Sequence, residues 1–77
     1  MRFKLFTLPS CPNCPAIKRF MELTKLAGEH IDASVQAGLD EAMKLGVKST
    51  PTVLFFEDGT IVGRAQTIGE IKEFLGM

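Results

Sequence analysis

The 77-residue chain has no tryptophan, no tyrosine, one histidine and two cysteines, and its nine basic side chains are matched by nine acidic ones. A formal net charge of zero argues against a nucleic-acid partner, because phosphate binding requires a concentrated basic surface. The longest apolar run, residues 53–56, is far shorter than the roughly 20 residues that span a bilayer. No apolar signal segment follows the first residues. We therefore expect a cytoplasmic protein with no membrane partner.

The two cysteines stand three residues apart, in the segment Cys11-Pro12-Asn13-Cys14. Closing so short a loop with a disulfide gains only about 2 kcal/mol from chain entropy, compared with about 3 kcal/mol for a 15-residue loop. A C-x-x-C pair in a chain without an export signal instead favours redox chemistry or metal binding. Structural zinc needs four ligands, whereas the chain offers this pair and His30, which we interpret as a solvated surface residue. We expect no metal and no cofactor; two inert buried thiols are the remaining alternative.

Hydrophobic periodicity predicts a single domain, residues 1–77, without repeats or linkers. Seven segments are expected, in the order strand, helix, strand, helix, strand, strand, helix, at residues 2–8, 12–27, 30–36, 39–45, 52–56, 60–64 and 68–75. Parallel strands joined by helices and followed by a hairpin imply an α/β fold (βαβαββα), a four-stranded mixed sheet with helices on both faces.

Several residues mark the expected ends of these segments. Gly28 is expected to terminate the first helix, and Asp58-Gly59 is the dipeptide typical of a two-residue hairpin turn. Thr67 and Glu70 have the spacing of a capping box, and Gly76 is expected to end the last helix. These signals support the order of elements, and above all an antiparallel pairing of the third and fourth strands.

A helix that begins near Pro12 places Cys11 at its N-cap and Cys14 about one turn inside. Cys14, Ile17 and Met21 then share one face, through steps of three and four residues. The unpaired N–H groups and positive dipole end of the helix favour a thiolate at Cys11. We therefore expect Cys11 to be the nucleophile that attacks a substrate disulfide, and Cys14 to be the resolving cysteine.

Three segments together carry a family resemblance: Cys11-Pro12-Asn13-Cys14 after a buried strand, Gly46-Val47-Lys48-Ser49-Thr50-Pro51-Thr52 before the next, and the Asp58-Gly59 turn. The chain resembles the thioredoxin/glutaredoxin superfamily along essentially its whole length, in the short glutaredoxin-like (redoxin) form. The resemblance implies a thioredoxin-like fold and thiol–disulfide oxidoreductase activity.

The resemblance also implies the residues of the site. The Thr50–Pro51 peptide bond is expected to be cis and to lie opposite the cysteines, so that the Thr50 backbone binds an extended substrate segment. A trans proline that starts an edge strand is the alternative. Three residues around the cysteines are expected to support the active site: Ser10, Pro12 and Asn13.

The chain departs from the family pattern at several positions. Leu5 stands where thioredoxins carry a buried aspartate, and Ser10 where they carry a tryptophan, so proton transfer at Cys14 is expected to use water or a backbone group. Glutathione-binding glutaredoxins carry a Gly-Gly pair that is absent from residues 63–67. We therefore expect a flavoprotein of the thioredoxin-reductase type as electron source, with glutathione as the alternative.

These patterns predict a monomeric oxidoreductase that carries electrons from a flavoprotein reductase to protein disulfides. A glutathione-dependent glutaredoxin is the first alternative. A soft-metal (copper or zinc) carrier is more remote, because ferredoxin-like metal-transfer domains have the order β-α-β-β-α-β, whereas the hairpin here precedes the last helix. An iron–sulfur-bridged dimer would need the missing glutathione site.

Overall fold

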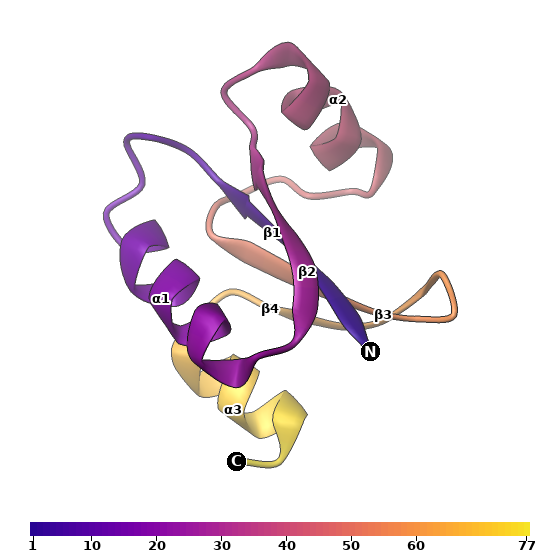
Figure 1. The fold of residues 1–77 in the computed structure, drawn as a ribbon. Coiled ribbons are helices and arrows are strands. Elements are labelled where there is room, and N and C mark those ends of the chain that lie inside the picture. The colour runs from indigo at the N-terminus through magenta and orange to yellow at the C-terminus, as the bar shows by residue number, and fades with distance from the viewer.

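The computed structural model describes all 77 residues and has the expected order of strands and helices (Figure 1). The elements are β1 (Arg2–Thr7), α1 (Cys14–Thr24), β2 (Ala27–Asp32), α2 (Gln36–Lys44), β3 (Thr52–Glu57), β4 (Thr60–Ala65) and α3 (Ile68–Leu75). The four strands form one mixed sheet in the order β2-β1-β3-β4. β1 pairs in parallel with β2, and the other two pairings are antiparallel. The expected α/β fold is confirmed.

Alternating side chains of the central strands build a separate core on each face of the sheet. Leu5 belongs to the core that α1 and α3 cover, whereas the next residue, Phe6, belongs to the core under α2. Figure 1 shows α1 and α3 close together and α2 apart from them. Because successive strand residues point to opposite faces, β1 and β3 are buried on both sides, as their nearly continuous apolar sequences indicate.

The first helix is shorter than the predicted residues 12–27. It ends at Thr24, and Lys25 rather than a glycine takes the left-handed conformation after it, with φ 60°. The assignment of Gly28 as the helix stop is wrong, because Gly28 lies inside β2. A Cβ atom at Gly28 would overlap the Phe3 ring, so glycine is needed there for close packing against β1.

The second strand begins and ends earlier than the predicted residues 30–36. It stops at Asp32, whose carboxylate accepts hydrogen bonds from the backbone N–H (2.8 Å) and the hydroxyl (2.6 Å) of Ser34. Such a local turn of an aspartate competes with strand pairing. Helix α2 therefore starts at Gln36, three residues before the predicted segment, and takes in Gly38.

The C-terminal hairpin and helix follow their sequence signals closely. Asp58 and Gly59 have φ values of 51° and 80°, the signs that a type I′ turn requires. The Thr67 hydroxyl accepts the Glu70 N–H at 3.1 Å, as a capping box predicts. The Glu70 carboxylate instead accepts the N–H of Gln66 at 2.7 Å, one residue earlier than in the standard motif. None of the three helices combines the length and the apolar composition required for crossing a bilayer.

Candidate active site

The two cysteines lie where the chain leaves β1 and enters α1, and they form a disulfide bond with a Cα–Cα distance of 5.5 Å. Helix α1 begins at Cys14, and Asn13 is its N-cap, so the predicted N-cap position of Cys11 is wrong. The backbone N–H of Cys11 donates to the carbonyl of Leu8 at 3.0 Å, which places Cys11 in the turn after β1. Pro15, rather than Pro12, occupies the first helical turn, where a missing N–H costs nothing.

This start of α1 gives the two sulfur atoms unequal surroundings. Cys14 is only 5% exposed and shares the buried face of α1 with Ile17 and Met21, as its spacing predicts. Cys11 is half-buried at the helix N-terminus. The first-turn N–H groups and the helix dipole favour negative charge at that end. The sulfur of Cys11 is thus accessible and lies where a thiolate is favoured, whereas the fold encloses the sulfur of Cys14.

The segment between α2 and β3 approaches the cysteines from the opposite side of the site. β3 pairs antiparallel with β1, Thr52 opposite Phe6, so Pro51 lies at the same end of the sheet as the turn that carries Cys11. The Thr50–Pro51 peptide bond is cis, as the resemblance implies, and Pro51 is buried. The Thr52 hydroxyl donates to the Ser49 carbonyl at 2.7 Å, which holds this turn closed.

The residues expected to support the cysteines lie at the protein surface. Ser10, Pro12 and Asn13 are all exposed, and the Asn13 side chain makes no capping hydrogen bond. They therefore surround Cys11 on the solvent side rather than packing beneath the disulfide. Thr50 is half-buried, between its exposed neighbour Ser49 and the buried Pro51.

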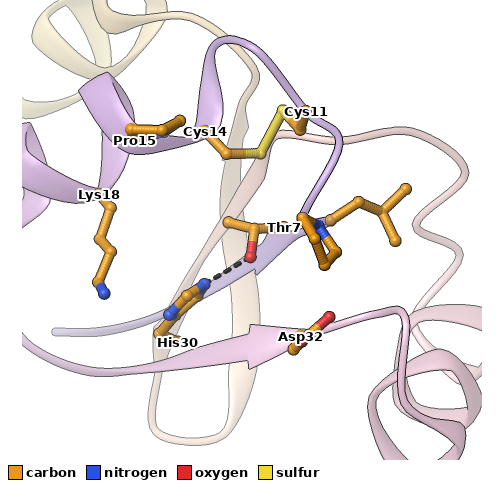
Figure 2. A pocket seen from close by; sticks show the side chains of 9 residues that line it. Thr7, Cys11, Cys14, Pro15, Lys18, His30 and Asp32 are labelled. Carbon is orange, nitrogen blue, oxygen red and sulfur yellow. Dashed lines mark hydrogen bonds between the residues drawn. A yellow bond between two sulfur atoms is a disulfide. The ribbon is translucent and has the colours of Figure 1, made fainter.

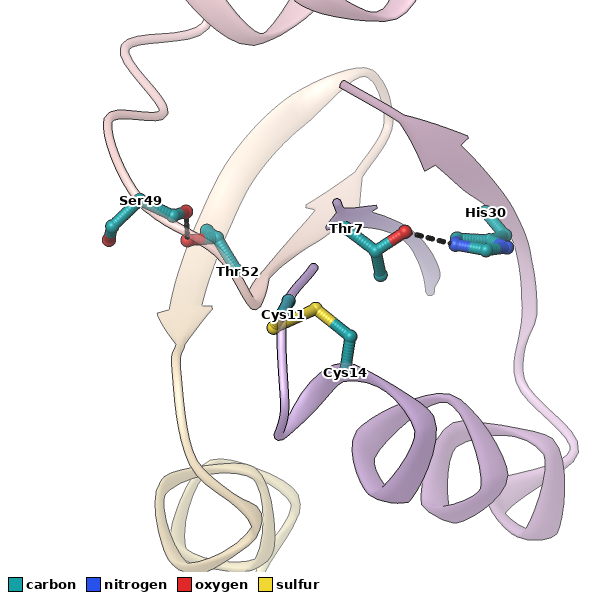
Figure 3. The surroundings of a disulfide bond; sticks show 6 residues. All are labelled: Thr7, Cys11, Cys14, His30, Ser49 and Thr52. Atoms are coloured by element: carbon teal, nitrogen blue, oxygen red, sulfur yellow. Dashed lines mark hydrogen bonds between the residues drawn. A yellow bond between two sulfur atoms is a disulfide. The ribbon is translucent and has the colours of Figure 1, made fainter. Parts of the chain in front are cut away.

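A pocket of about 310 Å³ opens beside the disulfide, between β1, β2 and the start of α1 (Figure 2). Its wall includes both cysteines, Thr7 and His30. The Thr7 hydroxyl and His30 Nε2 are hydrogen-bonded at 2.5 Å. In Figure 3, Ser49 and Thr52 lie on the Cys11 side of the disulfide, whereas Thr7 and His30 lie on the Cys14 side.

His30 is exposed, as its position in the sequence indicates, but its contact with the site is a feature that the sequence analysis missed. The removal of water from the covered side of the ring lowers the pKa of His30, and the positive charge of Lys18 lowers that pKa further. Asp32 opposes the shift. The imidazole is therefore held mainly neutral at pH 7. The contact depends on the parallel pairing of residues 2–7 with residues 27–32, which places His30 beside Leu5 and which no local sequence pattern indicates.

Comparison with known proteins agrees with this geometry. Residues 1–76 match a family model described as a thioredoxin domain. A thioredoxin of Methanocaldococcus jannaschii is 35% identical over 69 residues, which cover 82% of this chain and 79% of that protein. A probable thioredoxin of Archaeoglobus fulgidus is 30% identical over 78 residues, covering 94% of this chain and 82% of that protein.

Solved structures share the fold at lower sequence identity. Thioredoxin 1 of Thermosipho africanus superposes with a TM-score of 0.72 at 20% identity, over 99% of this chain and 96% of its own. Oxidised thioredoxin O2 of Arabidopsis thaliana gives 0.80 at 21% identity, over 99% of this chain and 70% of its own. The family match along residues 1–76, joined to the Cys11–Cys14 pair, shows that the chain belongs to the thioredoxin family of thiol–disulfide oxidoreductases.

Proposed function

We propose that this protein reduces disulfide bonds in other proteins, with Cys11 as the nucleophile and Cys14 as the resolving cysteine. The unequal exposure of the two sulfur-bearing residues is the observation that carries the proposal, because only Cys11 is accessible to a second protein. Cys14 lies three residues later, at the start of α1, and is bonded to Cys11 in the oxidised form. The substrate therefore meets Cys11 first.

The reaction then proceeds in two exchanges that balance in atoms and electrons. The Cys11 thiolate attacks one sulfur of the substrate disulfide, forms a mixed disulfide, and releases the other substrate sulfur as a thiolate. Cys14, after losing its proton, attacks Cys11 Sγ and releases the second substrate thiolate. The substrate gains two electrons, and the Cys11–Cys14 pair loses the same two as its disulfide forms.

The segment at Thr50 and Pro51 is proposed to bind the substrate backbone next to Cys11. Thr50 is only half-buried, and no secondary-structure element includes it, so an extended segment could pair with its backbone in the manner of an added strand. The exposed Ser10, Pro12 and Asn13 complete the surface that the substrate meets.

We further propose a flavoprotein of the thioredoxin-reductase type as the electron source, acting in the cytoplasm, where such enzymes keep thiols reduced. Both curated relatives that match the chain carry the name thioredoxin, one of them as probable. Residues 63–67 lack the Gly-Gly pair through which glutaredoxins hold glutathione. With nine basic and nine acidic side chains, no nucleic-acid partner is proposed.

The test is an NADPH-coupled insulin-reduction assay on the wild type and two variants, driven either by thioredoxin reductase or by glutathione with glutathione reductase. We expect turnover with thioredoxin reductase only. Cys11→Ser should abolish it, and Cys14→Ser should leave a covalent adduct with insulin, visible by mass spectrometry. Glu73→Gln, an exposed change on α3 that leaves the cysteines and the proposed substrate surface intact, is the control and should retain the wild-type activity. Turnover by Cys11→Ser would disprove the nucleophile, and turnover with glutathione alone would disprove the electron source.

A further inference from the structure

Resolution of the mixed disulfide requires a proton acceptor near Cys14, and the pocket beside the disulfide holds few groups that can serve. Cys14 is 5% exposed, so its thiol has little direct contact with bulk water. Besides the cysteines, the titratable side chains in the pocket wall are Lys18, His30 and Asp32. The side chain of Lys18 is a hydrogen-bond donor without an acceptor atom. The remaining candidates for the proton acceptor are the Asp32 carboxylate and the His30 imidazole.

Asp32 is the weaker candidate for this proton. Its carboxylate already accepts the Ser34 N–H at 2.8 Å and the Ser34 hydroxyl at 2.6 Å. These two hydrogen bonds lower the pKa of Asp32 below that of an ordinary aspartate. A carboxylate stabilised in this way is a poor base at neutral pH, where a general base works best with a pKa near the working pH.

Thr7 lies between the cysteines and His30 in the wall of the pocket. Thr7 is buried, and its carbonyl accepts the Ala33 N–H at 2.9 Å, which fixes the end of β1. The Thr7 hydroxyl and His30 Nε2 are hydrogen-bonded at 2.5 Å. Figures 2 and 3 both show Thr7 between the disulfide and the imidazole. A threonine hydroxyl can accept one proton while it donates its own.

We propose that His30 takes the proton of Cys14 through the Thr7 hydroxyl when the mixed disulfide is resolved. The Cys14 thiol passes its proton to Thr7 Oγ1, and the Thr7 hydroxyl proton moves to His30 Nε2, forming an imidazolium. The Cys14 thiolate then attacks Cys11 Sγ, and the substrate sulfur leaves with the electron pair of the broken bond. The imidazolium returns its proton to solvent on the exposed side of the ring.

The surroundings of His30 suit a base that must also release its proton. Lys18 and Glu22 face it from α1, and Glu29 and Asp32 lie on its own strand. Partial burial and the Lys18 charge lower the pKa of His30, while Asp32 raises it. The ring is thus neutral before the reaction, and Asp32 lies nearby to stabilise the imidazolium once it forms. This inference rests on the proposed roles of Cys11 and Cys14.

The test separates the two exchanges by stopped flow with dithiobis(nitrobenzoate), which releases one coloured thiolate when Cys11 attacks and a second when Cys14 resolves. His30→Gln and Thr7→Val should leave the first phase unchanged and slow the second about a hundredfold at pH 7, the lower end of the contribution of a positioned general base. The difference should shrink toward pH 9, where a larger share of the Cys14 thiol ionises without the aid of a protein base. Thr7→Ser, which keeps the hydroxyl, should restore the second phase.

A control variant on α3 and an NMR titration of His30 accompany the kinetic measurement. Glu73→Gln, an exposed change on α3 away from the pocket, should match the wild type in both phases. His30 is the sole histidine, so its NMR titration is unambiguous, and its pKa should differ between the reduced and oxidised proteins. A second phase in His30→Gln with wild-type rate and pH profile would overturn the proton transfer while leaving the proposed function intact. Loss of the first phase in Cys14→Ser would instead contradict the assignment of Cys11 as nucleophile.

Discussion

Cys11 and Cys14 differ because of the residue at which α1 begins. The sequence correctly indicated one cysteine at the N-terminus of the helix and one on its buried face. It misplaced the helix start by two residues, because Pro12 and Pro15 both suit a first turn and local signals do not choose between them. The error leaves the chemistry unchanged, since Cys11 remains beside the N-terminus and Cys14 remains enclosed.

The contacts of His30, also a matter of single residues, could not be predicted from the sequence alone. An isolated histidine at a strand end is typical of a solvated residue, and its ring is in fact exposed. Its hydrogen bond to Thr7 depends on the register that pairs Leu5 with His30, and on the chain leaving β1 toward Cys11. Three elements contribute to that pocket, so no local pattern contains it.

The lowered pKa of His30 predicts how stability depends on pH in the oxidised protein, whose cysteines do not titrate. The unfolded chain binds a proton near the ordinary value of 6.5, before the folded protein does. The free energy of unfolding should therefore fall as the pH decreases through about 6.5, and level off below the folded pKa. Urea unfolding followed by circular dichroism between pH 7.5 and 5 measures this trend, since the chain has no tryptophan for fluorescence.

The same titration with His30→Gln provides the control. Its free energy of unfolding should be flatter with pH over that range. The lowered pKa of Asp32 acts at lower pH, because its stabilising effect is lost only as the carboxylate is protonated below 3.8. Equal slopes for wild type and His30→Gln between pH 7.5 and 5 would show that His30 has an ordinary pKa.

At the scale of elements, the sequence predicted all seven segments in order and missed the boundaries of α1, β2 and α2. The missed boundaries involve glycines whose role depends on another part of the chain. Gly28 allows the Phe3 ring to pack on β2, and Gly38 allows α2 to approach the Asp32 carbonyl. Both glycines resemble ordinary helix breakers when only neighbouring residues are considered. The hairpin turn and the Thr67 cap are purely local, and they were predicted correctly.

Gly38 and Gly69 offer a matched pair of substitutions within helices. A Cβ atom at Gly38 would overlap the backbone of Asp32, so Gly38→Ala should lower the free energy of unfolding by about 1–3 kcal/mol. A Cβ atom at Gly69 meets only Thr67 Oγ1, at 3.8 Å, so Gly69→Ala should raise stability by up to about 1 kcal/mol. Urea unfolding of the two variants measures both values, and a neutral or stabilising Gly38→Ala would show that α2 does not pack so closely on Asp32.

At the scale of the whole molecule, the sheet order β2-β1-β3-β4 brings two separate surfaces to the cysteines. The segment before β3 lies on the Cys11 side, and the pocket with His30 lies on the Cys14 side (Figure 3). The fold thus separates the place proposed for the substrate from the place proposed for the proton. The cysteines were predicted from sequence patterns and the cis Thr50–Pro51 bond from the family resemblance, whereas this separation follows from strand pairing.

The central claim is that the fold makes Cys11 the reactive sulfur and encloses Cys14. Alkylation of the fully reduced protein with limiting iodoacetamide at pH 7, followed by peptide mass spectrometry, measures the modification rate of each cysteine directly. We expect Cys11 to react at least about tenfold faster than Cys14, through its thiolate and its exposure, and this difference to vanish in urea. Equal rates in the folded protein, or faster modification of Cys14, would contradict the account.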